Sequence, residues 1–349
     1  MTHQAVLVEE IGKPMVLGPR PTPQPQPGQL LVKVQSTMLL PHDTYGRDGG
    51  LFFGDRLPFV LGTNISGIVE SLGHNTTNFQ IGDRVFGLGN PASPTPEFSG
   101  LQEYSLLEAQ ASAKIPDGFS FDQAATFPVN VITSMGALFH PLGFDFSAPF
   151  HESDKVSEKD KSILIIGGGS NVGKYSIQLA KLAGIGKIVT IASVANKRLL
   201  KALGATYVVD RHNSESDIAS QIQDIVGVDG LDKIYDCVSW DHSFPISLLS
   251  TKKPGTLLVL HPSEEAERFV KEKGLDVRVQ FIVGTSEFLQ PLTKRVWECL
   301  PGWIEEGKLA VANYKTIEGF NLKAIEEGLD SYRDGKPVTP VVVHPWGEV

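Results

Sequence analysis

Residues 39–50, with the sequence LLPHDTYGRDGG, bring together side chains that can move protons. His42 and Tyr45 are candidate acids, because an imidazole with an ordinary pKa of about 6.5 and a phenol can each donate a proton to a substrate oxygen. Two aspartates in the same segment make a metal site conceivable, since carboxylates and imidazoles also bind metal ions. Three interpretations are therefore open: a metal site, an acid/base site, or a loop that only contacts a cofactor.

A glycine-rich stretch, IIGGGSNVGKYS, is a candidate for nucleotide binding. Gly168, Ser170 and Gly173 give the pattern G-x-S-x-x-G in place of G-x-G-x-x-G. The stretch follows an apolar run typical of a strand and opens a segment with apolar residues at helical spacing, which is the setting of a dinucleotide site. Glycines let the backbone approach a pyrophosphate, whose charge then faces the N-terminus of the helix.

The end of the next expected strand, in the sequence TIASVANKRLL, indicates which nucleotide binds. An NAD site places an acidic residue there, on the ribose hydroxyls, and this stretch contains none. It supplies instead groups that can hydrogen-bond and neutralise a 2′-phosphate: Ser193, Asn196, Lys197, Arg198 and, after the third strand, Arg211. NADPH is therefore the expected cofactor, although Lys197 and Arg198 also fit a solvated helix face.

The elements around these residues are of two kinds. The first 125 residues contain short stretches with the alternation of strands, such as QLLVKVQS and RVFGLG. Residues 126–285 alternate strand and helix patterns, which predicts an α/β domain with a doubly wound parallel sheet. The strand-like VTPVVVHP needs a sheet to join, so we expect residues 286–349 to return to the first domain.

Composition excludes several classes of protein. Forty acidic and 31 basic residues give a net charge of −9, which disfavours nucleic acid or an anionic membrane as the main partner. The only two cysteines, Cys237 and Cys299, cannot form a disulfide framework or a thiolate zinc cluster. No apolar stretch approaches the roughly 18 residues of a membrane helix, and the first residues lack the pattern of a secretory signal. We expect a cytoplasmic protein.

Five motifs resemble the medium-chain dehydrogenase/reductase superfamily in the same order and across nearly the whole chain: LGTNISGIVESLG with IGDRVFG, GLQEYSLL, AATFPVNVITS, GGGSNVGKYSIQLAK and LKALGATYVVD. Within it the chain is most similar to zinc-independent fungal members, namely quinone-oxidoreductase-like proteins and trans-acting enoyl reductases of polyketide synthases. The resemblance implies a GroES-like β-rich catalytic domain, built from both termini, into which a Rossmann domain is inserted. It also implies a small-molecule or acyl-thioester substrate, a polyketide synthase as partner, and a monomer or homodimer.

The resemblance shows where a catalytic zinc would bind. The zinc-dependent branch uses a cysteine, a Gly-His-Glu and a later cysteine, and this chain has Pro41, the sequence GTN at 62–64, and Val129 at the matching positions. The four clustered cysteines of a structural zinc lobe are also missing. Because zinc needs about four N, S or O ligands and His42 cannot form a site alone, we expect no metal.

The opening segment departs from its zinc-free relatives. Those relatives read Asn-Pro-x-Asp-Trp-Lys beside the nicotinamide. This chain keeps Pro41 and Asp43 but has Leu40, Tyr45 and Gly46 where those relatives have Asn, Trp and Lys. A tyrosine that another branch uses falls at Leu51. Tyr45 and His42 remain the candidate proton donors, with a packed loop tyrosine and a surface histidine as the plain alternatives.

The resemblance also assigns the remaining site residues. The pyrophosphate contacts fall in the glycine-rich stretch, at Ser170, Asn171, Val172 and Gly173. Gly168 and Gly169 of the same stretch are also expected to bind the cofactor. The 2′-phosphate contacts are Ser193, Asn196 and Arg211, and Asp43 lies beside the nicotinamide. The nicotinamide and substrate pocket is lined by Asn130, Thr133, Phe281, Ile282, Val283, Gly284 and Thr285.

The chemistry follows from the missing zinc ligands. Reducing a C=C conjugated to a carbonyl places negative charge on the carbonyl oxygen, which backbone N–H groups or a hydroxyl can stabilise. Reducing an isolated C=O requires a stronger acid, so an enoyl, enone or quinone substrate is expected. The alternative is a nucleotide-binding protein of the same fold whose redox activity has lapsed, serving a non-redox step or a partner protein.

Overall fold

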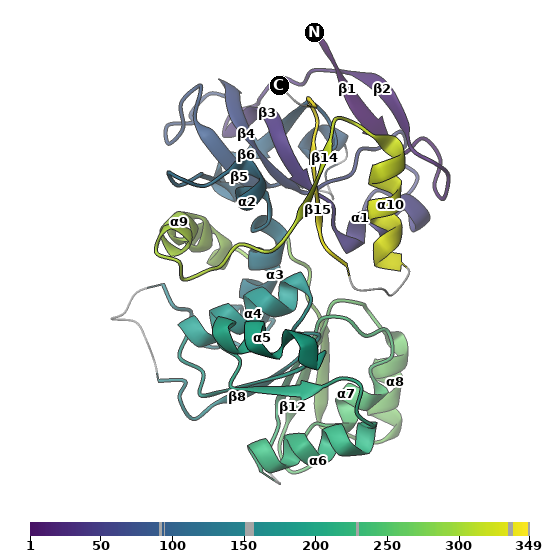
Figure 1. Cartoon of the computed structure of the whole chain (residues 1–349), viewed down its shortest axis with the longest axis vertical. Coiled ribbons are helices and arrows are strands. Elements are labelled where there is room, and N and C mark those ends of the chain that lie inside the picture. The colour runs from purple at the N-terminus through teal and green to yellow at the C-terminus, as the bar shows by residue number, and fades with distance from the viewer. Residues whose placement is uncertain (91–92, 94, 151–156, 228–229, 334–337, 348–349) are drawn as a thin grey trace. The chain divides into compact units, whose positions relative to one another are not determined.

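Two units make up the chain in a computed structural model that describes residues 1–349 except 91–92, 94, 151–156, 228–229, 334–337 and 348–349 (Figure 1). The first unit contains residues 1–129, 297–305 and 311–349, and the second contains residues 130–296 and 306–310. The sequence also predicts a solvated loop at the charged run of residues 151–162 and a helix end at Gly335. Residues 151–156 and Gly335 lie outside the described residues.

The first unit is built mainly from antiparallel strands. Its larger sheet runs in the order β14-β15-β3-β4-β5-β7, and β6 also pairs with β3. The bounds are β3 Gln29–Met38, β4 Asn64–Leu72, β5 Arg84–Leu88, β6 Tyr104–Glu108, β7 Ser112–Lys114, β14 Lys315–Glu318 and β15 Val341–His344. A separate ribbon joins β1 (Thr2–Leu7) to β2 (Val16–Pro21). Val342 of β15 pairs with Met38 of β3, so the strand near the C-terminus completes a sheet that begins near the N-terminus.

Strand β3 shows why these residues form a sheet. Leu30, Val32 and Val34 alternate along the strand and are fully buried on one face. Branched side chains at every second position fit a pleated, half-buried surface. Their partners in this core come from β4, β5 and β6, and each buried aliphatic side chain contributes roughly 1.5–3 kcal/mol.

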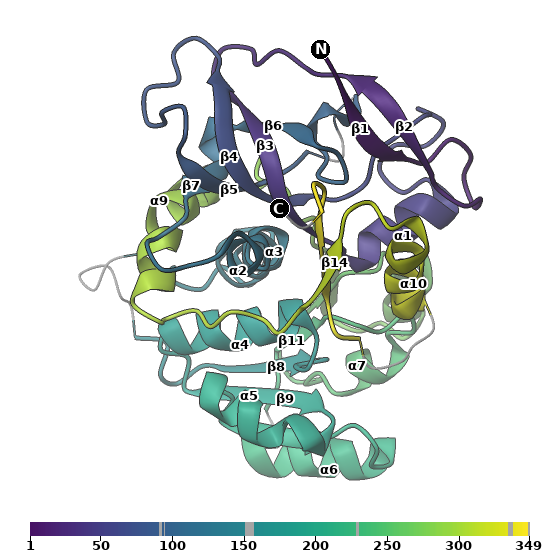
Figure 2. The same ribbon diagram turned by 45° about the horizontal axis from the view of Figure 1, so that its top comes forward.

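The opening segment is a helix, where the sequence analysis expected a loop. Helix α1 (Pro41–Gly49) begins with a proline at its first position, and the Asp43 carboxylate accepts the backbone N–H of Leu40 at 2.9 Å. It ends at Gly50, whose φ of 72° favours glycine. Figures 1 and 2 show α1 beside α10 (Leu322–Arg333), where the hydroxyl of Thr44 donates to the carbonyl of Leu329. A third helix of this unit is α2 (Phe121–Ala125).

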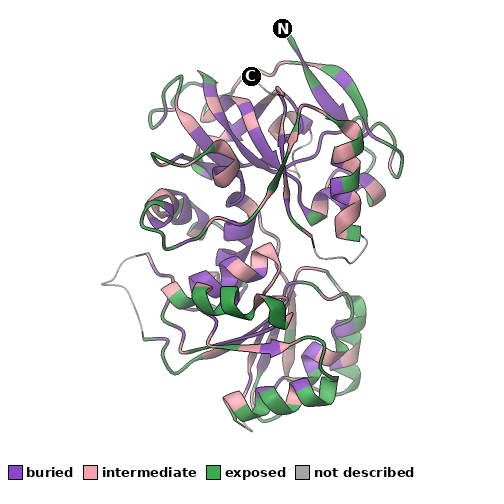
Figure 3. Ribbon diagram, viewed as in Figure 1, coloured by how far each residue is buried: buried purple, intermediate pink, exposed green. Residues whose placement is uncertain are grey.

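The second unit contains a six-stranded parallel sheet in the order β10-β9-β8-β11-β12-β13, which confirms the Rossmann prediction. The strands are β8 Ser162–Ile166, β9 Lys187–Ala192, β10 Tyr207–Asp210, β11 Lys233–Asp236, β12 Gly255–Val259 and β13 Val277–Phe281. The helices between them are α4 Asn171–Leu182, α5 Lys197–Leu203, α6 Glu215–Val226, α7 Ser243–Ser247 and α8 Glu264–Glu272. In Figure 3 the inner strands of this sheet, β8, β9, β11 and β12, are largely buried, whereas most residues of α5 and α6 are exposed.

The strand order fixes where a ligand can bind in this sheet. The order reverses between β8 and β11, and ligands of such sheets bind at the carboxyl ends of the strands near that point. Helices α3 (Pro128–Phe139) and α9 (Leu292–Glu305) contain residues of both units. Among the described residues no helix has the length and hydrophobicity needed to span a bilayer.

Candidate functional site

The glycine-rich segment forms the turn from β8 into α4 in the second unit. Ser170 is the N-cap of α4, and its hydroxyl accepts the backbone N–H of Gly173 at 3.0 Å. The serine that departs from the G-x-G-x-x-G pattern therefore satisfies one of the free amides at the start of the helix. The remaining amides and the helix dipole make this terminus suited to an anion.

Two glycines of this turn are required by close packing. A Cβ at Gly168 would lie 2.1 Å from the hydroxyl oxygen of Thr190 in β9, and a Cβ at Gly173 would lie 2.3 Å from the carbonyl oxygen of Gly167. Both distances are far below van der Waals contact, so only glycine fits. The turn has the close helix-to-strand packing that a pyrophosphate-binding loop needs, and its residues therefore fit a dinucleotide.

The residues expected at the 2′-phosphate gather at the carboxyl end of β9. The side-chain nitrogen of Asn196 lies 3.0 Å from the position of a Cβ on Gly169, which brings it to the phosphate loop. Arg211 follows β10, and its backbone N–H donates to the carbonyl of Ala192 beside Ser193. Lys197 and Arg198 start α5 and are exposed, as on a solvated helix face.

An aspartate that the sequence analysis did not consider also lies at this end of the sheet. Asp210 ends β10, and its carboxylate accepts the backbone N–H of His212 and lies 2.9 Å from the His212 ring. Hydrogen bonds from the His212 backbone first, and also from the His212 ring and the Val194 backbone, lower the Asp210 pKa. The Asp210 carboxylate is therefore already hydrogen-bonded by neighbouring groups of the chain.

The expected nicotinamide and substrate residues of the second unit partly lie together. A Cβ on Gly284 would lie 1.8 Å from the hydroxyl oxygen of Thr133, so the backbone after β13 packs against α3. Asn130 and Thr133 are buried. Thr285 is also buried, and its hydroxyl has no hydrogen-bond partner among the described residues. An unpaired buried hydroxyl fits a place where a ligand group completes the hydrogen bonding.

The rest of the expected FIVGT segment is placed as follows. Phe281 is the last residue of β13 and is half-buried. Ile282 is buried and donates its N–H to the carbonyl of Val259, and Val283 is half-buried.

Ser134 is a residue that the sequence analysis missed. Its hydroxyl lies 3.1 Å from the Val172 carbonyl at the start of α4 and accepts the hydroxyl of Ser176 at 2.9 Å. This buried pair fixes α3 against the phosphate-binding helix. The sequence shows Ser134 as a small polar residue within the mostly apolar segment that forms α3, and this feature could have indicated its role.

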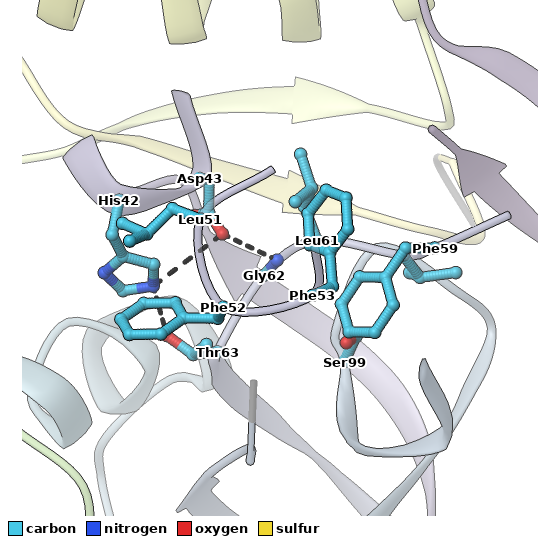
Figure 4. A pocket seen from close by; sticks show the side chains of 11 residues that line it. His42, Asp43, Leu51, Phe52, Phe53, Phe59, Leu61, Gly62, Thr63 and Ser99 are labelled. Atoms are coloured by element: carbon cyan, nitrogen blue, oxygen red, sulfur yellow. Dashed lines mark hydrogen bonds and ion pairs between the residues drawn. The ribbon is translucent and has the colours of Figure 1, made fainter. Parts of the chain in front are cut away.

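In the first unit, His42 lies against a small cavity (Figure 4). Its Nε2 is 3.0 Å from the hydroxyl oxygen of Thr63 and 3.8 Å from the Asp43 carboxylate. Asp43 is buried, and it accepts the backbone N–H of Gly62 at 2.9 Å as well as the α1 cap bond. The cavity of about 10 Å³ has room for about one water-sized group.

The electrostatics of this pair follow from burial. Burial lowers the pKa of His42, and the charge of Asp43 opposes the shift. Burial raises the pKa of Asp43, against the His42 charge and its two backbone hydrogen bonds. A histidine whose pKa is lowered is a stronger acid when charged, and it gives up its proton readily.

Tyr45, the other expected acid, is not one of the residues that line this cavity. It lies on α1 and is half-buried, and burial raises its pKa. The phenol therefore holds its proton at neutral pH. The structure brings His42 and Asp43 together and leaves Tyr45 out of that group.

Phe52 and Arg56 also belong to this region, although the sequence analysis did not select them. The Phe52 ring meets His42 edge-on with centroids 5.8 Å apart, and its φ of 74° is unusual for a bulky residue. The Arg56 guanidinium donates to the carbonyls of Phe52, Phe53 and Ser93 and so holds this backbone in place.

The positions matching zinc ligands carry groups with other partners. Thr63 contacts His42, and the amide of Asn64 accepts from the Val129 backbone and donates to the Ala125 carbonyl, both at 2.8 Å. In the part of the chain that the structure describes, no three His, Cys, Asp or Glu side chains form a group that could hold a metal ion. These residues do not fit a zinc site.

Comparison with known proteins identifies related families. Residues 26–117 match the family described as "Alcohol dehydrogenase GroES-like domain", and residues 171–293 match "Zinc-binding dehydrogenase". The trans-enoyl reductase tazE of Aspergillus terreus is 32% identical over 66% of this chain and 74% of its own length. The trans-enoyl reductase tndF of Aspergillus flavipes is 29% identical over 98% of both chains.

A further relative is lovC of Aspergillus terreus, the enoyl reductase component of lovastatin nonaketide synthase, 32% identical over 59% of this chain and 55% of its own length. Among solved structures, the quinone oxidoreductase of Coxiella burnetii is 25% identical, covers 99% of both chains and has a TM-score of 0.76. Mycobacterial Rv1454c, solved in complex with NADPH, is 23% identical, covers 98% of this chain and 100% of its own, and has a TM-score of 0.74.

Proposed function

Because the chain belongs to the medium-chain dehydrogenase/reductase superfamily, in its fungal enoyl-reductase-like branch, and is an oxidoreductase, we propose that it reduces an activated C=C with NADPH and without zinc. The substrate class is an enoyl or enone compound, or a quinone. The observation that carries the proposal is the His42–Thr63 hydrogen bond, at 3.0 Å, in the place of the metal ligands.

The chain's own residues supply position and protons. When bound, the nicotinamide supplies a hydride, which is the cofactor's own chemistry. The pyrophosphate of the dinucleotide binds at the start of α4, in the turn formed by Gly168, Ser170 and Gly173. Thr285 offers a buried hydroxyl to the bound ligand. His42 delivers the second proton to the reduced substrate, with Thr63 orienting its ring.

The choice of an alkene over an isolated carbonyl rests on acid strength. An enolate oxygen is far less basic than an alkoxide, so an imidazole or a water can protonate the product. A cavity beside His42 that holds one water-sized group suits this proton transfer.

NADPH is proposed over NADH because the stretch at the carboxyl end of β9 contains no acidic residue and basic side chains lie in or near it in the sequence, namely Lys197, Arg198 and Arg211. Asn196 and Arg211 lie there, and the carboxylate of Asp210 is engaged by His212 and Val194. A relative of the same fold binds NADPH, which supports the choice.

An acyl thioester carried by a polyketide synthase is the proposed natural substrate. Two relatives are named trans-enoyl reductases and a third is the enoyl reductase component of a synthase.

The test is NADPH consumption against enals, enones, quinones and acyl thioesters, with NADH in parallel. We expect turnover of at least one activated alkene, and a metal chelator should leave the rate unchanged. Turnover only with zinc added, or reduction only of simple aldehydes and ketones without a conjugated C=C, would contradict the proposal. Binding of NADPH with no turnover of any compound would favour the redox-inactive alternative.

A further inference from the structure

A buried ion pair at the carboxyl end of the second unit's sheet has no part in the chemistry above. Asp236 ends β11, and its carboxylate lies 3.1 Å from Nδ1 of His242. Both side chains are fully buried. The second oxygen of Asp236 accepts the backbone N–H groups of Val238 and Ser239 at 3.2 and 3.0 Å. Asp236 therefore fixes both ends of residues 237–242, here called the β11 loop.

His242 also connects the β11 loop to the chain that follows β12. Its Nε2 lies 3.2 Å from the carbonyl oxygen of His261, and Nδ1 of His261 donates to the carbonyl of Ser239 at 3.0 Å. Trp240 stacks on the His261 ring with centroids 3.9 Å apart. Because a carboxylate and a carbonyl can only accept, His242 makes both of its bonds only when both ring nitrogens carry protons.

The charges around His242 agree with a protonated ring. Burial lowers the pKa of His242, but the hydrogen bond and charge of Asp236 outweigh it, with help from the His261 carbonyl and Asp241, so that the net pKa is raised. His261 also faces this ring, and burial lowers its pKa, so it stays neutral.

The β11 loop packs against the phosphate-binding turn. A Cβ on Gly167 would lie 2.5 Å from the side chain of Val238, and the N–H of Cys237 donates to the carbonyl of Ile166 at the end of β8. The loop therefore packs directly on the residue that precedes Gly168. A shift of the loop would therefore change the packing around the phosphate-binding turn.

We propose that the Asp236–His242 pair is a positioning device, which holds the β11 loop against the phosphate-binding turn and makes dinucleotide affinity depend on the proton of His242. The inference rests on the nucleotide site proposed above. Loss of the proton leaves a nitrogen lone pair facing either the Asp236 carboxylate or the His261 carbonyl, and that repulsion releases one side of the loop.

The test measures the dissociation constant of NADPH by calorimetry between about pH 7 and about pH 9.5, above the second pKa of about 6 of a phosphate monoester. We expect the constant of the unmodified protein to rise about tenfold across this range, a usual size for coupling between two sites. His242→Asn keeps a donor toward Asp236 but cannot titrate. The NADPH dissociation constant of this variant should therefore stay the same over this pH range. His242→Gln keeps the donor toward His261 and is the second variant should the first not fold.

His140→Gln is the matched control, because this histidine of the same unit bonds only a backbone N–H, that of Leu142, among the interactions of its ring that the structure describes. Its profile should match that of the unmodified protein. Tight NADPH binding with one constant at every pH in the unmodified protein overturns this inference and leaves the proposed cofactor intact. A protein that binds no NADPH at any pH overturns the proposed cofactor and this inference together.

Discussion

His42 is the side chain on which the proposed chemistry depends most directly. If its imidazolium is the acid, the rate falls as pH rises through its pKa, which burial places below the ordinary value. Replacing His42 with glutamine should lower turnover by about 10²-fold near pH 5, where the imidazolium is most populated, and remove this pH dependence, because general acids contribute about 10²–10⁴-fold. Steady-state kinetics from about pH 5 to pH 8 measure both effects. An unchanged pH profile would exclude His42 as the donor.

Thr63 can be tested against a threonine of the same unit. Thr63→Val removes the hydroxyl that orients the His42 ring, and we expect about a tenfold loss of turnover with little change in NADPH affinity. Thr44→Val is the control, since its hydroxyl bonds the Leu329 carbonyl between α1 and α10. It should lower the melting temperature without a comparable loss of turnover. Equal losses of turnover in both variants would indicate a structural effect only.

Tyr45, unlike His42, is expected to contribute little to turnover. The structure leaves its side chain outside the His42 cavity, and burial raises its pKa, which makes it a weaker acid. Tyr45→Phe should therefore keep turnover within about twofold of the unmodified protein, because only the hydroxyl is lost. A fall of 10²-fold or more on the best substrate would assign the proton to Tyr45 instead.

Arg211 decides the proposed cofactor preference. NADPH should bind at least about tenfold more tightly than NADH, an effect that one charged contact to a phosphate can supply. Arg211→Ala should narrow this ratio by weakening NADPH alone, and titration with both nucleotides measures it. Arg268→Ala, an exposed arginine on α8, is the control that should leave the ratio unchanged. Equal affinities for NADPH and NADH in the unmodified protein would contradict the assignment.

At the scale of elements, the Rossmann strands were predictable because short apolar runs alternate with helical periodicity from Ser162 onward. Helix α1 was not, since its proline, its two glycines and its polar residues have low helix propensity. Asp43 caps it through a local bond from the backbone of Leu40, but the Asp43 carboxylate also accepts the backbone N–H of Gly62, and α10 packs beside the helix. The last two interactions depend on backbone that is distant in the sequence. Local periodicity carries no such information.

For the site residues, too, sequence predicts only what depends on local spacing. The phosphate-binding turn could be found from its glycines, because their spacing is local. Thr63 could not, since it contacts His42 from 21 positions away. The Asp236–His242 pair lies within seven residues, but its pairing depends on how the β11 loop turns. Contacts set by tertiary packing or by loop geometry leave no pattern that sequence alone displays.

At the scale of the whole molecule, one histidine ties the end of the chain to its beginning. His344 in β15 lies 2.7 Å from Asp122 of α2 through Nε2, and 2.9 Å from Glu318 of β14 through Nδ1. The Ser36 hydroxyl of β3 also donates to Asp122. With a carboxylate at each ring nitrogen, His344 is an imidazolium, and its pKa is raised because these hydrogen bonds and charges outweigh burial.

This arrangement predicts how the stability of the chain changes with pH. The folded-state pKa of His344 lies above its unfolded value of about 6.5, so its stabilisation is complete below pH 6.5 and is lost as pH rises through the folded pKa. His344→Asn should therefore lower the melting temperature by a few degrees near pH 6, and the difference should shrink toward pH 9. The expected size is about 1 kcal/mol, reduced because the ring is partly exposed, and about 1 kcal/mol corresponds to about 2–4 °C. His74→Asn, an exposed histidine of the same unit, should leave the melting curve unchanged at both pH values. Calorimetry that finds the same difference between His344→Asn and the unmodified protein at pH 6 and pH 9 would show that His344 stabilises the fold by packing and not by its charge.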